Sequence, residues 1–209
     1  MENPTKHPFY HMDDLPNEVY LKGSLAIDTE AMGLHPMRDR LCVVQICDED
    51  GNVHIVHFSS QAYNCPNLKQ LLMDNKRLKI FHFARFDVAL IQHALNVALQ
   101  NIYCTKISSK LARTYTDQHG LKDVCNELLN VKLSKQQQSS DWGAARLTPE
   151  QVNYAANDVI HLHELRHKLD AMLLRENRLE IAQKCFDFIP ARATLDLLGW
   201  SGIDIFMYP

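Results

Sequence analysis

Short apolar segments, bounded by charged residues or glycine, dominate the first half of the chain. They are rich in Val and Ile and short enough to favour β-strands over helices. Gly51 and Asn52 separate two of these segments and predict a hairpin turn. The expected strands are residues 24–28, 41–47, 53–58, 78–83 and 102–104.

Helical spacing of apolar residues becomes the main pattern in the second half. The best-marked helix begins at Thr148, because Thr148, Pro149 and Gln151 supply an N-cap, a first-turn proline and a capping-box partner. We expect it to run through Tyr154 and Asp158 as far as residue 174. The other expected helices are residues 66–73, 86–95, 106–114 and 121–129.

Strands first and helices later, with a hairpin near the start, predict an α/β fold with a mixed β-sheet flanked by helices. The length of 209 residues suits one domain, residues 1–209, with a core over about 20–175. Residues 136–140 are a polar loop by composition. The segment from Pro190 onward is apolar and aromatic, so we expect it to pack on its own domain or on a neighbouring chain.

The charge balance limits the kind of partner. Lys and Arg total 22 against 25 Asp and Glu, which gives a net charge of −3. Proteins that coat long nucleic acids usually carry a basic excess, since neutralising phosphates supplies most of their affinity. A nucleic-acid substrate is therefore expected to be short or held only locally.

The remaining compositional features favour a cytoplasmic protein without a membrane segment. No apolar run approaches the roughly 20 residues needed to cross a bilayer, and the N-terminus has no signal-peptide pattern. Most of the six cysteines lie within apolar stretches and form no C-x-x-C pair, which favours buried thiols over a disulfide or zinc framework.

Three carboxylate motifs are the candidate chemistry. Asp28 and Glu30 end the first strand on one face, Asp87 stands at the start of a helix, and Tyr154 and Asp158 share a helix face. Each motif has an ordinary structural alternative. Asp28 and Glu30 could lie at a solvated strand edge, and Asp87 could simply stabilise the start of its helix. Tyr154 could be a core residue with Asp158 at the rim of the core. Together they supply four carboxylates, the hard oxygen ligands that Mg²⁺ or Mn²⁺ requires. Two such ions can drive phosphodiester hydrolysis.

The order of these motifs resembles the DEDD exonuclease superfamily, in the branch whose third motif carries a Tyr, as in ribonuclease D. The other branch has a His five residues before the last Asp, where this chain has Asn153. The segments DRLCVVQI, CTKISSKLARTYTDQHGLKDVC, LSKQQQSSDW and ARATLDLLGWSGIDIF extend the likeness over essentially the whole chain. They are similar to the nano-RNase C family of short ribonuclease D relatives.

The resemblance implies an RNase H-like domain that removes single nucleotides from RNA 3′ ends and acts on very short RNA, down to dinucleotides. Asp28, Glu30, Asp87 and Asp158 would bind two Mg²⁺ or Mn²⁺ ions, and Tyr154 would orient the attacking water. The family also implies a ring-like homo-oligomer, and the sequence implies no other protein partner. A ribonuclease D-type processor of longer RNA and a catalytically silent nucleic-acid-binding module remain as alternatives.

Further residues are candidates for contact with the substrate. In the enzymes that this chain resembles, a Leu at the position of Leu34 separates two bases. The alternative is that Leu34 is a core residue. His82 and Phe83 could contact a ribose or stack on a base. A loop with Gln138, Ser139 and a buried or substrate-facing Trp142 could receive a 5′-phosphate. The stripe of Lys106, Lys110 and Arg113 suits a solvated face or a phosphate guide, and His161 and His163 are expected at the surface.

Overall fold

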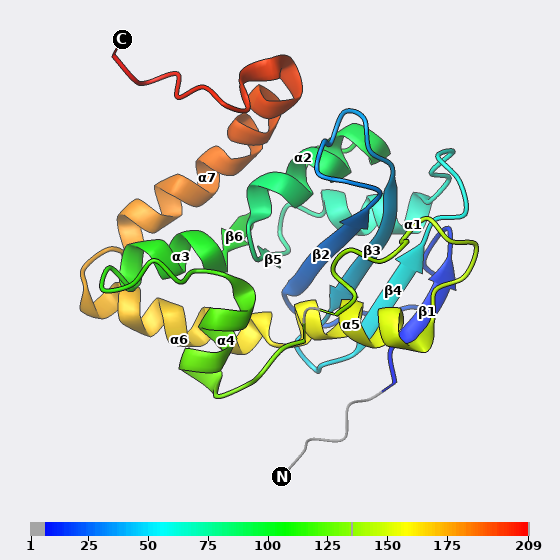
Figure 1. Cartoon of the computed structure of the whole chain (residues 1–209), viewed down its shortest axis with the longest axis horizontal. Helices are drawn as coiled ribbons and strands as arrows, with labels where there is room; N and C mark the ends of the chain where they lie inside the picture. The colour runs from blue at the N-terminus through cyan, green and yellow to red at the C-terminus, as the bar shows by residue number, and fades with distance from the viewer. Residues whose placement is uncertain (1–6, 135, 209) are drawn as a thin grey trace.

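A mixed six-stranded sheet forms the centre of the computed structural model, which describes residues 7–134 and 136–208 (Figure 1). The strand order is β1-β4-β3-β2-β5-β6. β3 runs antiparallel to both of its neighbours, whereas the β1–β4, β2–β5 and β5–β6 pairs are parallel. The strands are β1 (Phe9–Met12), β2 (Leu25–Ala31), β3 (Leu41–Cys47), β4 (Val53–His57), β5 (Lys79–Phe81) and β6 (Ile102–Cys104).

Helices cover the sheet and extend beyond its β6 edge. α5 packs across β2, β3 and β4, while α7 packs along α2 and α6 along α3 (Figure 1). The helices are α1 (Pro66–Met73), α2 (Ala84–Leu95), α3 (Thr105–Ala112), α4 (Leu121–Leu129), α5 (Pro149–Ile160), α6 (Leu162–Arg175) and α7 (Leu179–Leu195), with an irregular turn over Asp196–Trp200. The mixed sheet flanked by helices confirms the predicted fold class. No helix within the described residues has both the length and the apolar character needed to cross a membrane.

Several helix and strand boundaries in the structure differ from those predicted from the sequence. The helix from Thr148 has its full capping box, but it is interrupted at His161 and continues as α6. The strand expected over residues 78–83 ends at Phe81. β1 and α7 were not predicted: β1 is a short, exposed edge strand, and α7 contains Pro190, a residue that normally argues against a helix interior.

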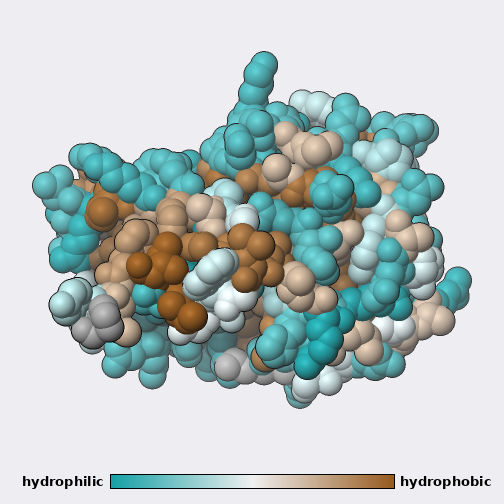
Figure 2. Space-filling model, turned by 90° about the horizontal axis from the view of Figure 1, so that it is seen from above, coloured by the Kyte–Doolittle hydropathy of each residue, from teal (hydrophilic) through white to brown (hydrophobic). Residues whose placement is uncertain are grey.

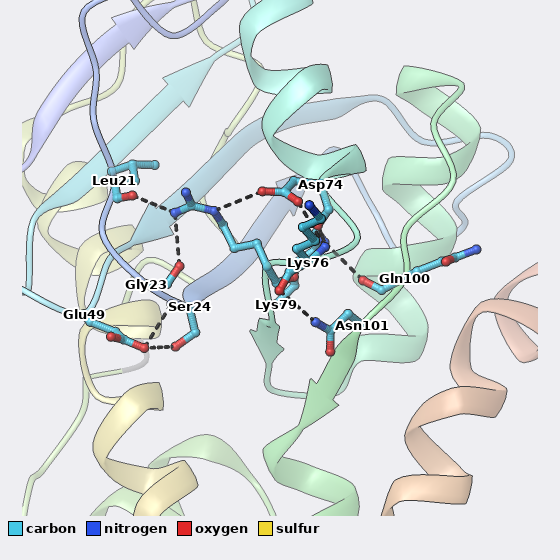
Figure 3. Close-up of polar contacts among 10 residues, drawn as sticks. Leu21, Gly23, Ser24, Glu49, Asp74, Lys76, Lys79, Gln100 and Asn101 are labelled. Carbon is cyan, nitrogen blue, oxygen red and sulfur yellow. Dashed lines mark hydrogen bonds and ion pairs between the residues drawn. The ribbon is translucent and has the colours of Figure 1, made fainter.

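A fully buried lysine anchors the start of β5 (Figure 3). The Lys79 ammonium donates hydrogen bonds to the carbonyl oxygens of Asp74, Arg77 and Gln100, at 2.7, 3.0 and 3.1 Å. Arg77 in turn donates to the carbonyl oxygens of Leu21 and Gly23, just before β2. Three acceptors satisfy the buried cation, although burial still lowers the pKa of Lys79 to about 8. These bonds tie together the chain segments that lead into β2, β5 and β6.

Candidate active site

The carboxyl ends of the parallel strands β2, β5 and β6 meet at one edge of the sheet. This edge is where open α/β sheets usually place their ligands. Asp28 and Glu30 leave one face of β2, and Asp158 reaches them from α5, which packs across that strand. One carboxylate oxygen from each of the three residues lies within 4.8 Å of the other two. Residues 28, 30 and 158, which the sequence predicted as ligands, thus converge.

Asp87 approaches this group from α2. It lies in the first turn of the helix and is only 3% exposed. The hydroxyl of Thr29, which points to the opposite face of β2 from Asp28 and Glu30, donates a 2.6 Å hydrogen bond to Asp87 Oδ1. Thr29 therefore fixes the carboxylate of the second motif, a role that no pattern in the sequence indicates.

Gln45 holds Asp28 from the neighbouring strand. The two residues are paired across β2 and β3, and Gln45 Nε2 donates a 3.1 Å hydrogen bond to Asp28 Oδ2. Gln45 is fully buried, and its Oε1 atom has no hydrogen-bond partner among the described residues. An amide in the otherwise apolar strand LCVVQIC was the available signal for this residue.

Tyr154 lies one helical turn before Asp158 and donates a hydrogen bond from its hydroxyl to that carboxylate. Its ring packs against Trp142 with the ring centroids 6.0 Å apart. Trp142 itself is 2% exposed, so it supports Tyr154 from beneath instead of facing the substrate cavity. Of the two roles considered for Trp142, the structure favours the buried, structural one.

The four carboxyl groups strongly perturb one another's protonation. Loss of hydration, followed by repulsion from Asp158 and Asp87, raises the pKa of Glu30 to about 9. Burial and then the other three carboxylates raise the pKa of Asp28 well above its usual range. Burial raises the pKa of Asp87 and of Asp158 to about 7. A divalent cation bound among these acids would relieve this repulsion.

The donor set fits a hard divalent cation. It consists only of carboxylate oxygens, which Mg²⁺ and Mn²⁺ prefer over the nitrogen and sulfur ligands favoured by zinc or copper. Asp28, Glu30 and Asp158 would hold such ions, and Asp87 lies close enough to be electrostatically coupled to the same group.

A cavity of about 340 Å³ opens over the carboxylates. Leu34, His82 and Gln138, three of the candidates for substrate contact, line it, and Leu34 is 83% exposed at its mouth. Lys106 and Lys122 add two cations to the wall. The sequence does not indicate this role for Lys122, because the charge of one helix residue does not reveal which side of the helix faces the cavity.

His82 and Phe83 follow β5 directly. His82 Nδ1 lies 2.9 Å from Thr105 Oγ1, whereas Nε2 has no hydrogen-bond partner among the described residues. Burial lowers the pKa of His82 to about 3, so the ring is neutral at physiological pH. Phe83 adopts a left-handed backbone conformation (φ 72°) and is 45% exposed, with Lys106 Nζ 4.3 Å from its ring centroid. Strained residues of this kind are concentrated at functional sites.

Other surface predictions need correction. Arg113 does not belong to a solvated stripe with Lys106 and Lys110, because it is fully buried and paired with Glu127. His163 is not a free surface residue either: it is half-buried, and its Nε2 lies 3.0 Å from the carbonyl oxygen of Cys47. Ser139 is exposed and lies outside the residues that line the carboxylate cavity.

Comparison with known proteins agrees with this geometry. A family model described as 3′–5′ exonuclease matches residues 10–174. Ribonuclease D of Gluconacetobacter diazotrophicus is 30% identical over 156 residues, which are 75% of this chain but 39% of that protein. The chain thus spans about two fifths of the length of this curated relative.

Solved structures extend the likeness to nearly the full chain. NrnC of Brucella melitensis bound to pGG is 50% identical, with a TM-score of 0.92, and the match covers 96% of this chain and 98% of that one. The same protein with bound Mg²⁺ is 48% identical at a TM-score of 0.92, covering 98% and 100% of the two chains.

Proposed function

The chain belongs to the 3′–5′ exonuclease family, and from this premise we propose that it is a metal-dependent exoribonuclease that degrades short RNA to nucleoside 5′-monophosphates. The observation that carries the proposal is the convergence of Asp28, Glu30 and Asp158, with Asp87 coupled to them, at the floor of an open cavity. Bringing these four partly to fully buried acids together costs stability unless a cation neutralises them, which supports a metal-binding role.

Two divalent cations, Mg²⁺ or Mn²⁺, are the proposed cofactors, and the Mg²⁺-bound NrnC structure supports the metal class. When bound, they would supply an activated water and neutralise charge at the leaving oxygen. Asp28, Glu30, Asp87 and Asp158 would hold the ions. Tyr154 would orient the attacking water, since its hydroxyl already lies at Asp158 and its ring is fixed by Trp142.

Short RNA, and dinucleotides in particular, is the proposed substrate. The NrnC structure bound to pGG supports this choice. The exposed Leu34 at the mouth would separate the two bases, and His82, which lines the cavity, would contact a ribose. Lys106 and Lys122 line the cavity and could attract phosphates locally, which agrees with a chain of net charge −3. Gln138 lines the cavity and would contact the 5′-phosphate, with Ser139 adjacent to it in the loop.

The test is product analysis on 5′-labelled RNAs of two to seven nucleotides with Mg²⁺ or Mn²⁺. We expect a dinucleotide to be hydrolysed at least tenfold more efficiently than a heptamer, because a longer RNA forfeits one or two charge-assisted hydrogen bonds to its 5′-phosphate. Leu34→Ala should slow dinucleotide cleavage. Equal kcat/KM for both lengths would contradict the dinucleotide assignment and favour ribonuclease D-like trimming of longer RNA.

The metal site needs a separate test with a matched control. Asp28→Ala should abolish hydrolysis, whereas Asp187→Ala, at an exposed position on α7, should leave it unchanged. Turnover by Asp28→Ala comparable to the parent at saturating Mg²⁺ would refute the ligand assignment. Absence of hydrolysis by the parent itself would instead favour the silent binding module.

A further inference from the structure

A second cavity, of about 290 Å³, lies beside the carboxylate cavity, between α3 and α7. Lys106 lines both cavities, and Phe83 forms part of the wall of the second. The interior is mostly apolar and includes Ile107 and Phe188. Figure 2 shows hydrophobic residues gathered over the end of the molecule to which α7 and the C-terminal segment belong.

The rim of this cavity carries four cations: Arg85, Lys106, Lys110 and Arg192. Arg85 and Arg192 share one carboxylate, that of Asp196, at N–O distances of 2.5 and 3.0 Å. Lys106 and Lys110 form no ion pair with any described residue. An excess of positive charge therefore surrounds an apolar cavity in a chain whose net charge is negative.

An apolar interior surrounded by a cationic rim matches one class of ligand. An apolar cavity of this size accepts one flat aromatic ring system, and unpaired cations at its mouth favour an attached phosphate. The half-exposed Phe83 ring can stack on a base, and Lys106 above it can bind the anion. We propose that this cavity is an accessory site for one nucleoside 5′-monophosphate, separate from the carboxylates.

This inference rests on the proposed function only for the choice of ligand, because nucleoside 5′-monophosphates are the products of that reaction. A product held here would occupy Lys106, which also faces the carboxylate cavity. Binding at the two cavities is then negatively coupled, and the coupling is reciprocal. Accumulated product would weaken the binding of the next short RNA.

The experiment measures equilibrium binding of 5′-AMP in EDTA by calorimetry, to the parent protein and to Asp28→Ala. Both should bind 5′-AMP with the same affinity, because the accessory cavity needs neither metal nor carboxylate. Adenosine, which lacks the phosphate, should bind at least tenfold more weakly. Binding that disappears in Asp28→Ala, or equal binding of adenosine and 5′-AMP, would overturn the proposal.

Two variants locate the binding. Lys110→Glu reverses an exposed charge at the rim and should weaken 5′-AMP binding at least tenfold. The matched control Lys184→Glu makes the same change on the exposed face of α7, where Lys184 pairs with Glu180, and should have no effect. Cys185→Trp, which fills the cavity from its wall, should also abolish binding. Equal affinities for Lys110→Glu and Lys184→Glu would place the ligand elsewhere and refute the site.

Failure of this inference can be distinguished from failure of the proposed function. Hydrolysis of labelled short RNA by the parent protein tests the nuclease independently of 5′-AMP binding in EDTA. A chain that hydrolyses dinucleotides but does not bind 5′-AMP retains the proposed function and loses the accessory site. Binding of 5′-AMP without any hydrolysis would support the accessory site and contradict the proposed function.

Discussion

Tyr154 is fixed at both ends of its side chain, by the Asp158 carboxylate at the hydroxyl and by Trp142 at the ring. Tyr154→Phe keeps the ring contact and removes only the hydroxyl, so the variant should fold normally. Positioning and acid–base groups contribute about 10²–10⁴-fold to rate. We therefore expect kcat for dinucleotide hydrolysis to fall by about tenfold or more, with little change in KM.

Tyr103, which is buried, provides the control for this prediction. The Tyr103 hydroxyl donates a 2.7 Å hydrogen bond to Asp170, outside the carboxylate cavity. Tyr103→Phe removes a comparable Tyr–Asp bond and should lower the melting temperature without changing kcat. If both variants kept the parent kcat, Tyr154 would be a core aromatic residue and not a catalytic one.

Gln45 acts on the metal site through Asp28. Gln45→Leu removes the hydrogen bond to Asp28 Oδ2 and also removes a buried carbonyl oxygen that has no partner, so stability should change little. Residues that orient a metal ligand typically affect metal affinity by about 10–100-fold. The Mg²⁺ concentration for half-maximal activity should rise by about tenfold or more. A superimposable Mg²⁺ activation curve would exclude this positioning role.

At the scale of elements, β2 and α5 bring together acids whose charges oppose folding unless a cation is bound. The folded protein holds protons on these groups more tightly than the unfolded chain does, because the pKa of Glu30 rises to about 9 and those of Asp87 and Asp158 to about 7. Their contribution to the free energy of unfolding is therefore greatest at low pH. It is lost as pH rises from the unfolded values, about 4, through the folded values.

The comparison that isolates this contribution is between the parent and Glu30→Gln in EDTA. His82 and Lys79 have lowered pKa values, so their contribution to stability rises with pH, opposite to that of the acids. Because both proteins contain these two residues, their effect cancels in the comparison. From pH 6 to 9 the melting temperature of the parent should fall relative to that of Glu30→Gln. Added Mg²⁺ should raise the parent's melting temperature more at pH 9 than at pH 6. Parallel pH profiles for the two proteins in EDTA would contradict the shift assigned to Glu30.

The elements that the sequence could predict are those specified by local signals. The apolar strand β3, the turn at Gly51 and the capping box at Thr148 depend on neighbouring residues, and all three occur in the structure. β1 is a strand only because it pairs with β4, more than 40 residues away. α7 is stabilised by packing on α2, which outweighs the unfavourable Pro190 inside it.

The residues of the candidate site also fall into those that local sequence could predict and those that depend on tertiary packing. The acids at 28, 30, 87 and 158 have residue types and spacings that indicate metal chemistry, so their positions could be predicted. Thr29, Gln45 and Lys122 are ordinary in sequence and gain their roles only when strands and helices pack together. The cavity between α3 and α7 could not be foreseen at all, because α7 itself was not predicted.

At the scale of the whole molecule, the C-terminal segment remains largely uncovered. Arg192 binds the backbone carbonyls of Trp200, Ser201 and Ile203, and Phe188 packs on Phe206, which fixes the path of the segment. Its apolar side chains nonetheless face outward, consistent with the hydrophobic area of Figure 2. The exposed apolar residues of this segment are Leu198, Trp200, Ile203, Ile205, Phe206, Met207 and Tyr208. Contiguous exposed apolar surface usually marks an interface.

We propose that residues 1–209 act as one exonuclease domain whose C-terminal segment contacts other copies of the chain in a homo-oligomer. Sedimentation or light scattering should then find an assembly larger than a monomer. Phe206→Asp, at a 77% exposed position, should reduce its mass, because a buried charge without a partner opposes association. Tyr20→Asp, at an 82% exposed position outside the segment, should leave the mass unchanged. A monomeric parent, or equal masses for both variants, would leave the segment without this role.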